Sequence, residues 1–256
     1  MALPESPRFL ARRPAQWPQL IALLKRFGHS LASDTEFEED QPGHGSERVS
    51  VRALFAPSLR RDTVSLWLTF FSCLGSIYLV FGWLPALLTT RGFDSATASS
   101  GLAIYNFGGV LGVLIWAVLV PLLGSRVPLV SGSLACAASA LALLLVPMQV
   151  QGSHTLLMVF LGINGLLANA IQASLYALAA YVYPTKIRAT GVAYCSTLGR
   201  TGGLLSSLWG ASIIQAGASH YWEVLAIAMV VAAAGLAFVR SHYPAATLST
   251  MTSQLD

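Results

Sequence analysis

The chain has 256 residues, of which 55% are hydrophobic and only 10% are charged. Soluble domains carry about 25% charged residues, so this composition argues against a soluble domain. The net charge of +4 would suggest a nucleic-acid partner in a soluble protein, but here the placement of lysine and arginine around apolar segments explains the excess, and no nucleic-acid partner is expected. The cysteines Cys73, Cys136 and Cys195 lie far apart in apolar sequence, which supports neither a disulfide framework nor a zinc site.

Residues 1–63 are mostly polar and are predicted to form a cytoplasmic connector. The segment near 15–28 predicts a short amphipathic helix that Pro18 starts and Gly28 ends. Its apolar residues recur at helical spacing, at Trp17, Leu20, Ile21, Leu23, Leu24 and Phe27. An acidic patch at 34–40 and a basic stretch up to Arg61 follow, so we expect the connector to lie against the membrane surface.

Six apolar stretches come next, and each is long enough to cross about 30 Å of hydrocarbon as a helix. They are placed near 64–90, 99–123, 127–149, 155–182, 190–214 and 221–240. The short loops between them predict antiparallel neighbours, and residues 241–256 are predicted to be a cytoplasmic tail. The expected fold class is an all-α membrane protein in which six transmembrane helices, within 64–240, form one bundle.

Lysine and arginine are distributed asymmetrically about this bundle. Those that precede the first span are Arg8, Arg12, Arg13, Lys25, Arg26, Arg48, Arg52, Arg60 and Arg61. With six spans, Arg126, Lys186, Arg188 and Arg240 fall on the same side, and Arg91 alone falls on the other. Because cytoplasmic loops carry the excess of positive charge, both termini are predicted to be cytoplasmic.

The stretch Tyr181–Gly203 contains the strongest functional candidate. An apolar run ends at Tyr183, a basic turn with Lys186 and Arg188 follows, and the next apolar run carries Arg200 well inside it. At a rise of about 1.5 Å per residue, Arg200 lies about 15 Å deep, near the bilayer midplane. A charge at that depth is a hypothesis for substrate binding or gating. The alternatives are a clamp on the backbone carbonyls of a neighbouring helix and snorkelling to the interface.

Other polar and aromatic side chains inside the spans are candidates for a substrate cavity. In the fourth span Asn169 and Gln172 share one helix face, while Asn164 lies more than one turn earlier. These amides indicate either a polar cavity or interhelical hydrogen bonds. The aromatic candidates, which could stack on a ring-bearing ligand or pack between helices, and one adjacent amide are Tyr78, Trp83, Tyr105, Asn106 and Tyr176.

Acidic residues are absent from the centre of every predicted span. Asp62, Asp94 and Glu223 lie at the edges of spans or in loops. A proton-coupled carrier usually needs an intramembrane acid, so the residues provide no obvious proton site. The sequence also contains no nucleophile–base pair, metal-ligand cluster or phosphate-binding loop, and therefore no enzyme activity, cofactor or metal site is expected.

Three motifs resemble the major facilitator superfamily. The segment Pro4–Leu10, P-E-S-P-R-F-L, resembles the signature that follows the sixth helix of sugar-porter-like members. The segment Tyr183–Gly191, followed by Gly199–Gly202, resembles the junction and eleventh helix of the aromatic acid:proton symporter branch, and Tyr105–Gly112 resembles the eighth helix. The resemblance implies that the chain is the central cytoplasmic loop and C-terminal six-helix half of a twelve-helix carrier in the inner membrane.

The chain also departs from that family pattern. It lacks the counterpart of an N-terminal half, the loop 124–128 has no aspartate, and Tyr181 stands where relatives often have an acid. We therefore expect either a half carrier for small organic anions, with aromatic acids first, or an inactive or split module that needs a second six-helix half. Proton coupling is implied by the family but is left open by the residues, and the sequence does not decide whether the chain pairs with a second copy of itself.

The resemblance assigns provisional roles to the candidate residues. Arg200 would pair with a substrate carboxylate or hold a gate, the fourth-span amides would line the pocket, and the aromatics would stack on a ring. The cytoplasmic cations Arg126, Lys186 and Arg188 would lock the inward face through charge pairs. A membrane enzyme is the remaining alternative, and no catalytic group supports it.

Overall fold

The computed structural model describes residue 10 and residues 16–26, 51–146 and 154–245. The chain divides into two compact units, Met1–Arg48 and Val49–Asp256. In the first unit, helix α2 spans Trp17–Arg26, inside the segment whose apolar spacing predicts an amphipathic helix. Leu20 and Ile21 are buried on one face of α2 and Gln19 is exposed, as that spacing requires.

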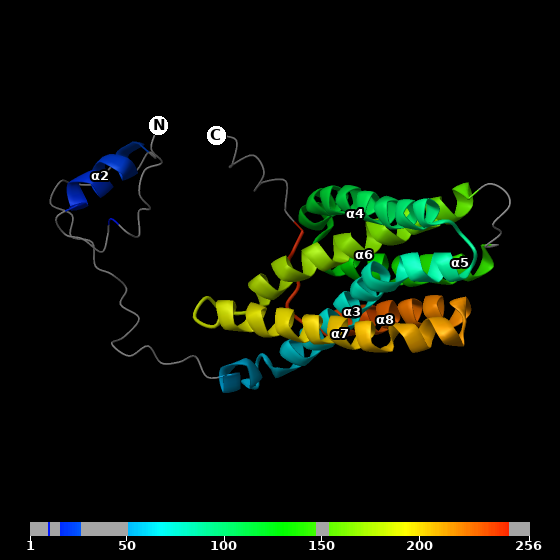
Figure 1. The fold of residues 1–256 in the computed structure, drawn as a ribbon. Coiled ribbons are helices and arrows are strands. Elements are labelled where there is room, and N and C mark those ends of the chain that lie inside the picture. Colours follow the sequence, from blue (N-terminus) through cyan, green and yellow to red (C-terminus); the bar gives the residue numbers. More distant parts are fainter. Residues whose placement is uncertain (1–9, 11–15, 27–50, 147–153, 246–256) are drawn as a thin grey trace. The chain divides into compact units, whose positions relative to one another are not determined.

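The second unit is a bundle of one short 3-10 helix and long α-helices (Figure 1). The elements are η2 (Val51–Phe55), α3 (Arg60–Thr90), α4 (Ser95–Leu123), α5 (Arg126–Leu145), α6 (Thr155–Val182), α7 (Arg188–Ala216) and α8 (Ala218–Phe238). No strand occurs in the part of the chain that the structure describes. The prediction of an all-α fold is confirmed.

Local signals explain where two of these helices begin. Helix α4 starts at Ser95 rather than near 99, because the Asp94 carboxylate accepts hydrogen bonds from the backbone N–H of Ala96 (3.1 Å) and Thr97 (3.3 Å). An aspartate in this position satisfies N–H groups that a helix start leaves unpaired. Helices α7 and α8 are joined at Gly217, whose φ of 127° is a conformation that side chains rarely adopt.

Two helix pairs approach each other through glycines. Helix α4 packs on α6, and α3 packs on α7. A Cβ atom on Gly112 would overlap the backbone carbonyl of Leu166, and one on Gly165 would overlap that of Tyr105. On the other pair, a Cβ on Gly199 would lie 3.1 Å from the Phe70 carbonyl oxygen. Small residues of this kind let helices pack backbone to backbone in lipid, where no hydrophobic effect drives them together.

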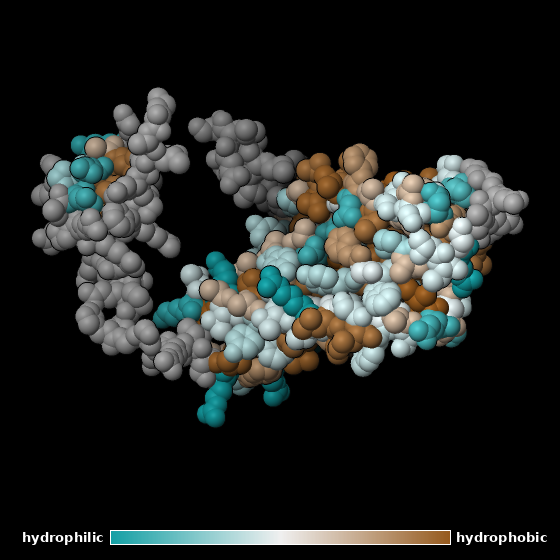
Figure 2. All heavy atoms as spheres, in the orientation of Figure 1, coloured by the Kyte–Doolittle hydropathy of each residue, from teal (hydrophilic) through white to brown (hydrophobic). Residues whose placement is uncertain are grey.

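Large apolar side chains are exposed along the bundle. On α4, Phe107 is 67% exposed, Leu114 62% and Val118 60%. Figure 2 shows apolar and weakly polar residues along the visible length of the bundle, with most of the hydrophilic residues toward its ends. Such a surface would be anomalous in water, but it is the surface that a helix bundle presents to hydrocarbon.

Five of the helices are long and apolar enough to cross a membrane, namely α3, α4, α5, α6 and α8. The remaining long helix, α7, has 29 residues, so its length also suffices. Its glycines, serines and threonines, together with Arg200, make it less apolar than the others. Helix α7 packs along α3 and therefore belongs to the bundle, although hydropathy alone does not identify α7 as a membrane span.

Candidate functional site

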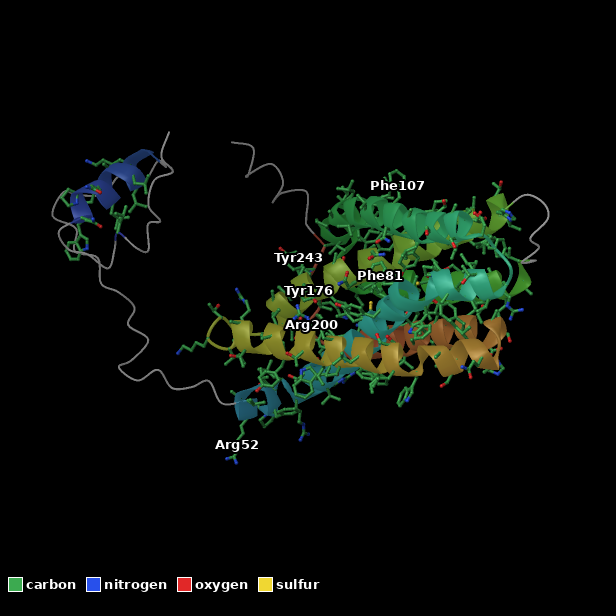
Figure 3. The ribbon with its side chains drawn as sticks, in the orientation of Figure 1. Arg52, Phe81, Phe107, Tyr176, Arg200 and Tyr243 are labelled. Carbon is green, nitrogen blue, oxygen red and sulfur yellow. The ribbon has the colours of Figure 1, made fainter. Side chains whose placement is uncertain are left out.

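Arg200 lies midway along α7 (Figure 3). It follows the first residue of the helix, Arg188, by twelve positions, which at 1.5 Å per residue is about 18 Å. The neighbouring Gly199 and Gly202 are buried against the backbone of α3, whereas the Arg200 side chain is exposed. Within the described residues no hydrogen bond or ion pair is recorded for its guanidinium. The clamp on backbone carbonyls, one of the two alternatives to a substrate or gating role, is therefore not observed among these residues.

An open groove lies between the end of α6 and the start of α7, and we call it the α6–α7 groove. Its volume is about 620 Å³, within the range of small-molecule sites. The lining residues are Tyr176, Ala180, Thr185, Arg188, Ala189, Val192, Ala193 and Ser196. Its polar groups are those of Tyr176, Thr185, Arg188 and Ser196, and the rest of the lining is small and apolar.

Hydrogen bonds and a ring contact hold the polar groups of the groove. The Arg188 guanidinium donates from Nε to the Tyr183 carbonyl (3.3 Å) and from Nη2 to Thr185 Oγ1 (3.4 Å). Across the groove, the Tyr176 hydroxyl lies 3.5 Å from Ser196 Oγ. The Tyr176 ring is also fixed edge-on against Phe70 of α3, with centroids 5.1 Å apart. One ring, three hydroxyls and a cation thus surround a space lined by small apolar side chains.

Arg200 lies on α7 beyond the residues that line the groove. Ser196 and Arg200 are four positions apart on α7, so they lie on one side of the helix, one turn from each other. Two predicted site residues, Tyr176 and Arg188, therefore share a groove; Arg200 does not line it but lies one helical turn beyond Ser196, which does. Ser196 was not predicted as a site residue. Its position one helical turn before an arginine midway along a membrane helix could have identified it.

The three amides of α6 do not act together. Asn164 is 4% exposed and faces α5, where its Nδ2 donates to Ser139 Oγ (2.8 Å) and to the Cys136 carbonyl (3.2 Å). Asn169 Nδ2 donates to the Gly165 carbonyl of its own helix (2.9 Å). Gln172 is half-buried, one turn before Tyr176. The amide of Asn164 is thus used in helix packing, and Gln172 is the nearest of the three to the groove along the helix.

The two candidate residues on α4 also lie in different surroundings. Tyr105 is 1% exposed, and its hydroxyl is buried without a hydrogen-bond partner. Its ring lies edge-on beneath Phe81 of α3, at 6.0 Å between centroids, so Phe81 is the ring that reaches the surface. Asn106 is exposed, and its Nδ2 donates to the Leu102 carbonyl (2.9 Å). Phe81 is 37% exposed and was not among the predicted aromatic candidates.

The predicted gating cations lie at the end of the bundle that carries the α6–α7 turn. Lys186 and Arg188 belong to or adjoin that turn, and both are exposed. Arg126, at the start of α5, donates from Nη2 to the Ala237 carbonyl of α8 (3.4 Å). Among the described residues, no group of three or more His, Cys, Asp or Glu side chains could hold a metal ion.

Comparison with known proteins agrees with this architecture. The sequence model of the Major Facilitator Superfamily matches residues 20–207 and 66–253. The gallate transporter of Pseudomonas putida is 34% identical over 218 residues, which cover 84% of this chain and 47% of the relative. The 4-hydroxybenzoate transporter of Acinetobacter baylyi is 31% identical over 243 residues, 93% of this chain and 52% of the relative.

A third relative, the 3-(3-hydroxy-phenyl)propionate transporter of Escherichia coli, is 33% identical over 195 residues, 76% of this chain and 47% of its own length. The chain spans about half the length of the curated relatives it matches. The family match, the relatives and the helical bundle lead to one assignment: the chain belongs to the Major Facilitator Superfamily.

Proposed function

We propose that the chain is one half of a secondary carrier for small organic anions, with aromatic acids first among them. The observation that carries the proposal is Arg200, an exposed arginine midway along the membrane helix α7. Relatives of this chain are named as transporters of gallate and 4-hydroxybenzoate. A guanidinium at that depth is costly in hydrocarbon, and such residues in membrane bundles face a cavity or a partner. A carboxylate ligand would supply the missing countercharge.

The groove supplies what an aromatic acid requires. Arg200 can bind a carboxylate with two parallel hydrogen bonds, which lysine cannot do. Tyr176 offers an aromatic face next to the Ser196 hydroxyl, and Arg188 adds a second positive charge at the outer end of the groove. An anion would thus pass between two cations along α7, with its ring against Tyr176 and the small apolar residues of the wall.

We place the bundle in the inner membrane with both termini cytoplasmic. The cations at the end that carries η2 and the α6–α7 turn are Arg52, Arg60, Arg61, Arg126, Lys186, Arg188 and Arg240. Arg91 follows α3 at the opposite end. The positive-inside rule then puts the first of these ends, and the mouth of the α6–α7 groove, in the cytoplasm.

Transport by alternating access requires a second bundle to rock against this one. We propose that this is a second six-helix half or a second copy of the chain. Proton coupling is part of the proposal, and the interiors of the six described spans contain no acidic residue, so the coupling group would belong to the partner half.

That lack of an acid favours one second candidate, a membrane module that assembles with another half but moves no substrate. The two functions are separated by uptake of radiolabelled 4-hydroxybenzoate at imposed pH gradients, in cells expressing the chain alone or with the N-terminal half of a relative. Saturable uptake in either case supports the carrier. No uptake in both, with the two chains shown to associate, supports the module.

The role of Arg200 is tested in the same assay. Arg200→Ala should lower affinity by about thirtyfold or more, the loss expected when one partner of a desolvated charge pair is removed. Arg200→Lys should retain part of the uptake because it keeps the charge. Arg91→Ala, at the opposite end, is the matched control and should transport normally. Unchanged uptake in both Arg200 variants would end the assignment.

A further inference from the structure

Residues 239–245, which follow α8, lie across the end of the bundle that carries the groove, and we call them the strap. Their first anchor is Asp62, in the first turn of α3, whose side chain is 2% exposed. Its carboxylate accepts the backbone N–H of Arg240 (2.8 Å) and of Ser241 (3.3 Å). A buried carboxylate with two such donors holds the strap firmly to α3.

The second anchor is Ser125, in the turn between α4 and α5. Its backbone N–H donates to the Tyr243 carbonyl (2.9 Å), and its Oγ accepts the Tyr243 N–H (2.8 Å). The Ser125 hydroxyl then donates to His242 Nδ1 (3.1 Å), and His242 Nε2 donates to the Leu236 carbonyl of α8 (3.0 Å). This assignment of protons is the neutral imidazole that satisfies every partner.

The position before Ser125 is shaped for the same contact. Gly124 has a φ of 76°, and a Cβ there would lie 2.9 Å from the Tyr243 carbonyl oxygen. The strap can therefore approach the α4–α5 turn only because this residue is glycine.

The third contact of the strap is of a different kind. The Tyr243 ring lies edge-on against Tyr181, with centroids 4.9 Å apart. Both rings are roughly half exposed (Tyr243 is labelled in Figure 3). Tyr181 adjoins Ala180, which lines the α6–α7 groove, and precedes by two positions Tyr183, whose carbonyl holds Arg188. The strap thus contacts α6 at a residue next to one that lines the groove.

We propose that the strap is a latch that positions the end of α6 and so sets the width of the α6–α7 groove. The two hydrogen-bonded anchors fix the strap to α3 and to the α4–α5 turn. A single ring pair at an exposed rim is weaker than either anchor, so the Tyr181–Tyr243 contact is the part that can open while the bundle stays folded. The part of this inference that concerns substrate access rests on the proposed transport function.

The test reads the groove directly, without transport. Ala193 is exposed and lines the groove, whereas the native Cys73, Cys136 and Cys195 are buried, so a cysteine in Ala193→Cys would react with a charged maleimide over a low background. Labelling rates are compared in inverted membrane vesicles. Adding Tyr243→Ala should raise the rate by roughly two- to tenfold, the range that loss of one aromatic pair allows. Adding Tyr243→Phe, which keeps the ring, should leave the rate unchanged.

Tyr181→Ala tests the same contact from α6. It should raise labelling to the same extent, and the double variant Tyr181→Ala/Tyr243→Ala should label no faster than either single variant, because both remove one contact. Equal labelling of the Tyr243→Ala and Tyr243→Phe proteins, or additive effects in the double variant, would overturn the latch. Uptake is measured in parallel: changed labelling without any uptake would leave the latch standing and count against the transport function.

Discussion

The contact between α4 and α6 gives the most direct test of the packing, through Gly165→Ala. A methyl group at this position would overlap the backbone carbonyl of Tyr105, and the atoms behind that carbonyl are also backbone. No side-chain rotation can make room, so α4 and α6 would have to move apart. Gly82→Ala, within α3, is the matched control. Apart from its chain neighbours and the adjacent backbone of its own helix, no heavy atom lies within 4 Å of a Cβ at Gly82.

The size of the effect follows from these surroundings. Overpacking costs about 1–3 kcal/mol, and a clash with backbone on the opposite helix belongs at the upper end, about 3 kcal/mol. The control should instead gain up to about 1 kcal/mol, the usual difference between alanine and glycine inside a helix. At about 2–4 °C per kcal/mol for a domain of this size, Gly165→Ala should melt about 6–12 °C below the native protein.

The measurement is thermal unfolding of the detergent-purified proteins, followed by the loss of the monodisperse peak in gel filtration. Gly82→Ala should melt at or slightly above the native temperature. If Gly165→Ala melted within roughly 2 °C of this control, the helices would not be in backbone contact and the packing argument would be wrong. Gly165→Ala should also lower uptake, because α6 carries the tyrosine of the groove.

Three further outcomes are expected. Asn164→Leu should destabilise the bundle by about 1 kcal/mol in the same melting assay, since it removes an interhelical hydrogen bond. Hydrogen bonds from Thr97 lower the pKa of Asp94, so its stabilisation of α4 is present above the ordinary aspartate pKa and is lost as pH falls through the lowered one; Asp94→Asn should remove that acid dependence of the melting temperature. Burial, together with the charge of Arg126, lowers the pKa of His242, so the strap is most stable with neutral imidazole and loosens as pH falls below about 6.5. Because the thiolate that reacts with maleimide itself declines as pH falls, groove labelling is compared at each pH with that of the His242→Gln variant, and the ratio should rise as pH falls over that range.

The sequence predicts the helices much better than it predicts their neighbours. Apolar length and the asymmetry of lysine and arginine are properties of single segments, so they can be read residue by residue. That α4 packs on α6, and α3 on α7, is a property of segments far apart in the chain. In lipid both the buried and the exposed faces of a helix are apolar, so periodicity does not say which face meets protein.

The same limit explains the mixed result for the candidate residues. Tyr105 and Phe81 are both aromatic residues in apolar helices, yet the first is buried beneath the second. Asn164 and Gln172 look equivalent in the sequence, but the amide of Asn164 is bonded to α5. The strap was predicted only as a tail, because its contacts depend on backbone groups that carry no sequence signal.

The exposed surface of the bundle near Arg200 differs from the exposed apolar surface of α4. Phe107 and Leu114, near the middle of α4, are exposed apolar side chains that suit hydrocarbon. A guanidinium in hydrocarbon costs far more free energy than an apolar side chain does. About 18 Å of helix separates Arg200 from the start of α7 at the basic end of the bundle, so its side chain has a long way to reach the interface. The Arg200 side of α7 must therefore face water or another protein surface. Helix α7 can tolerate a lower apolar content than the other long helices because one of its faces is packed on α3 through glycines.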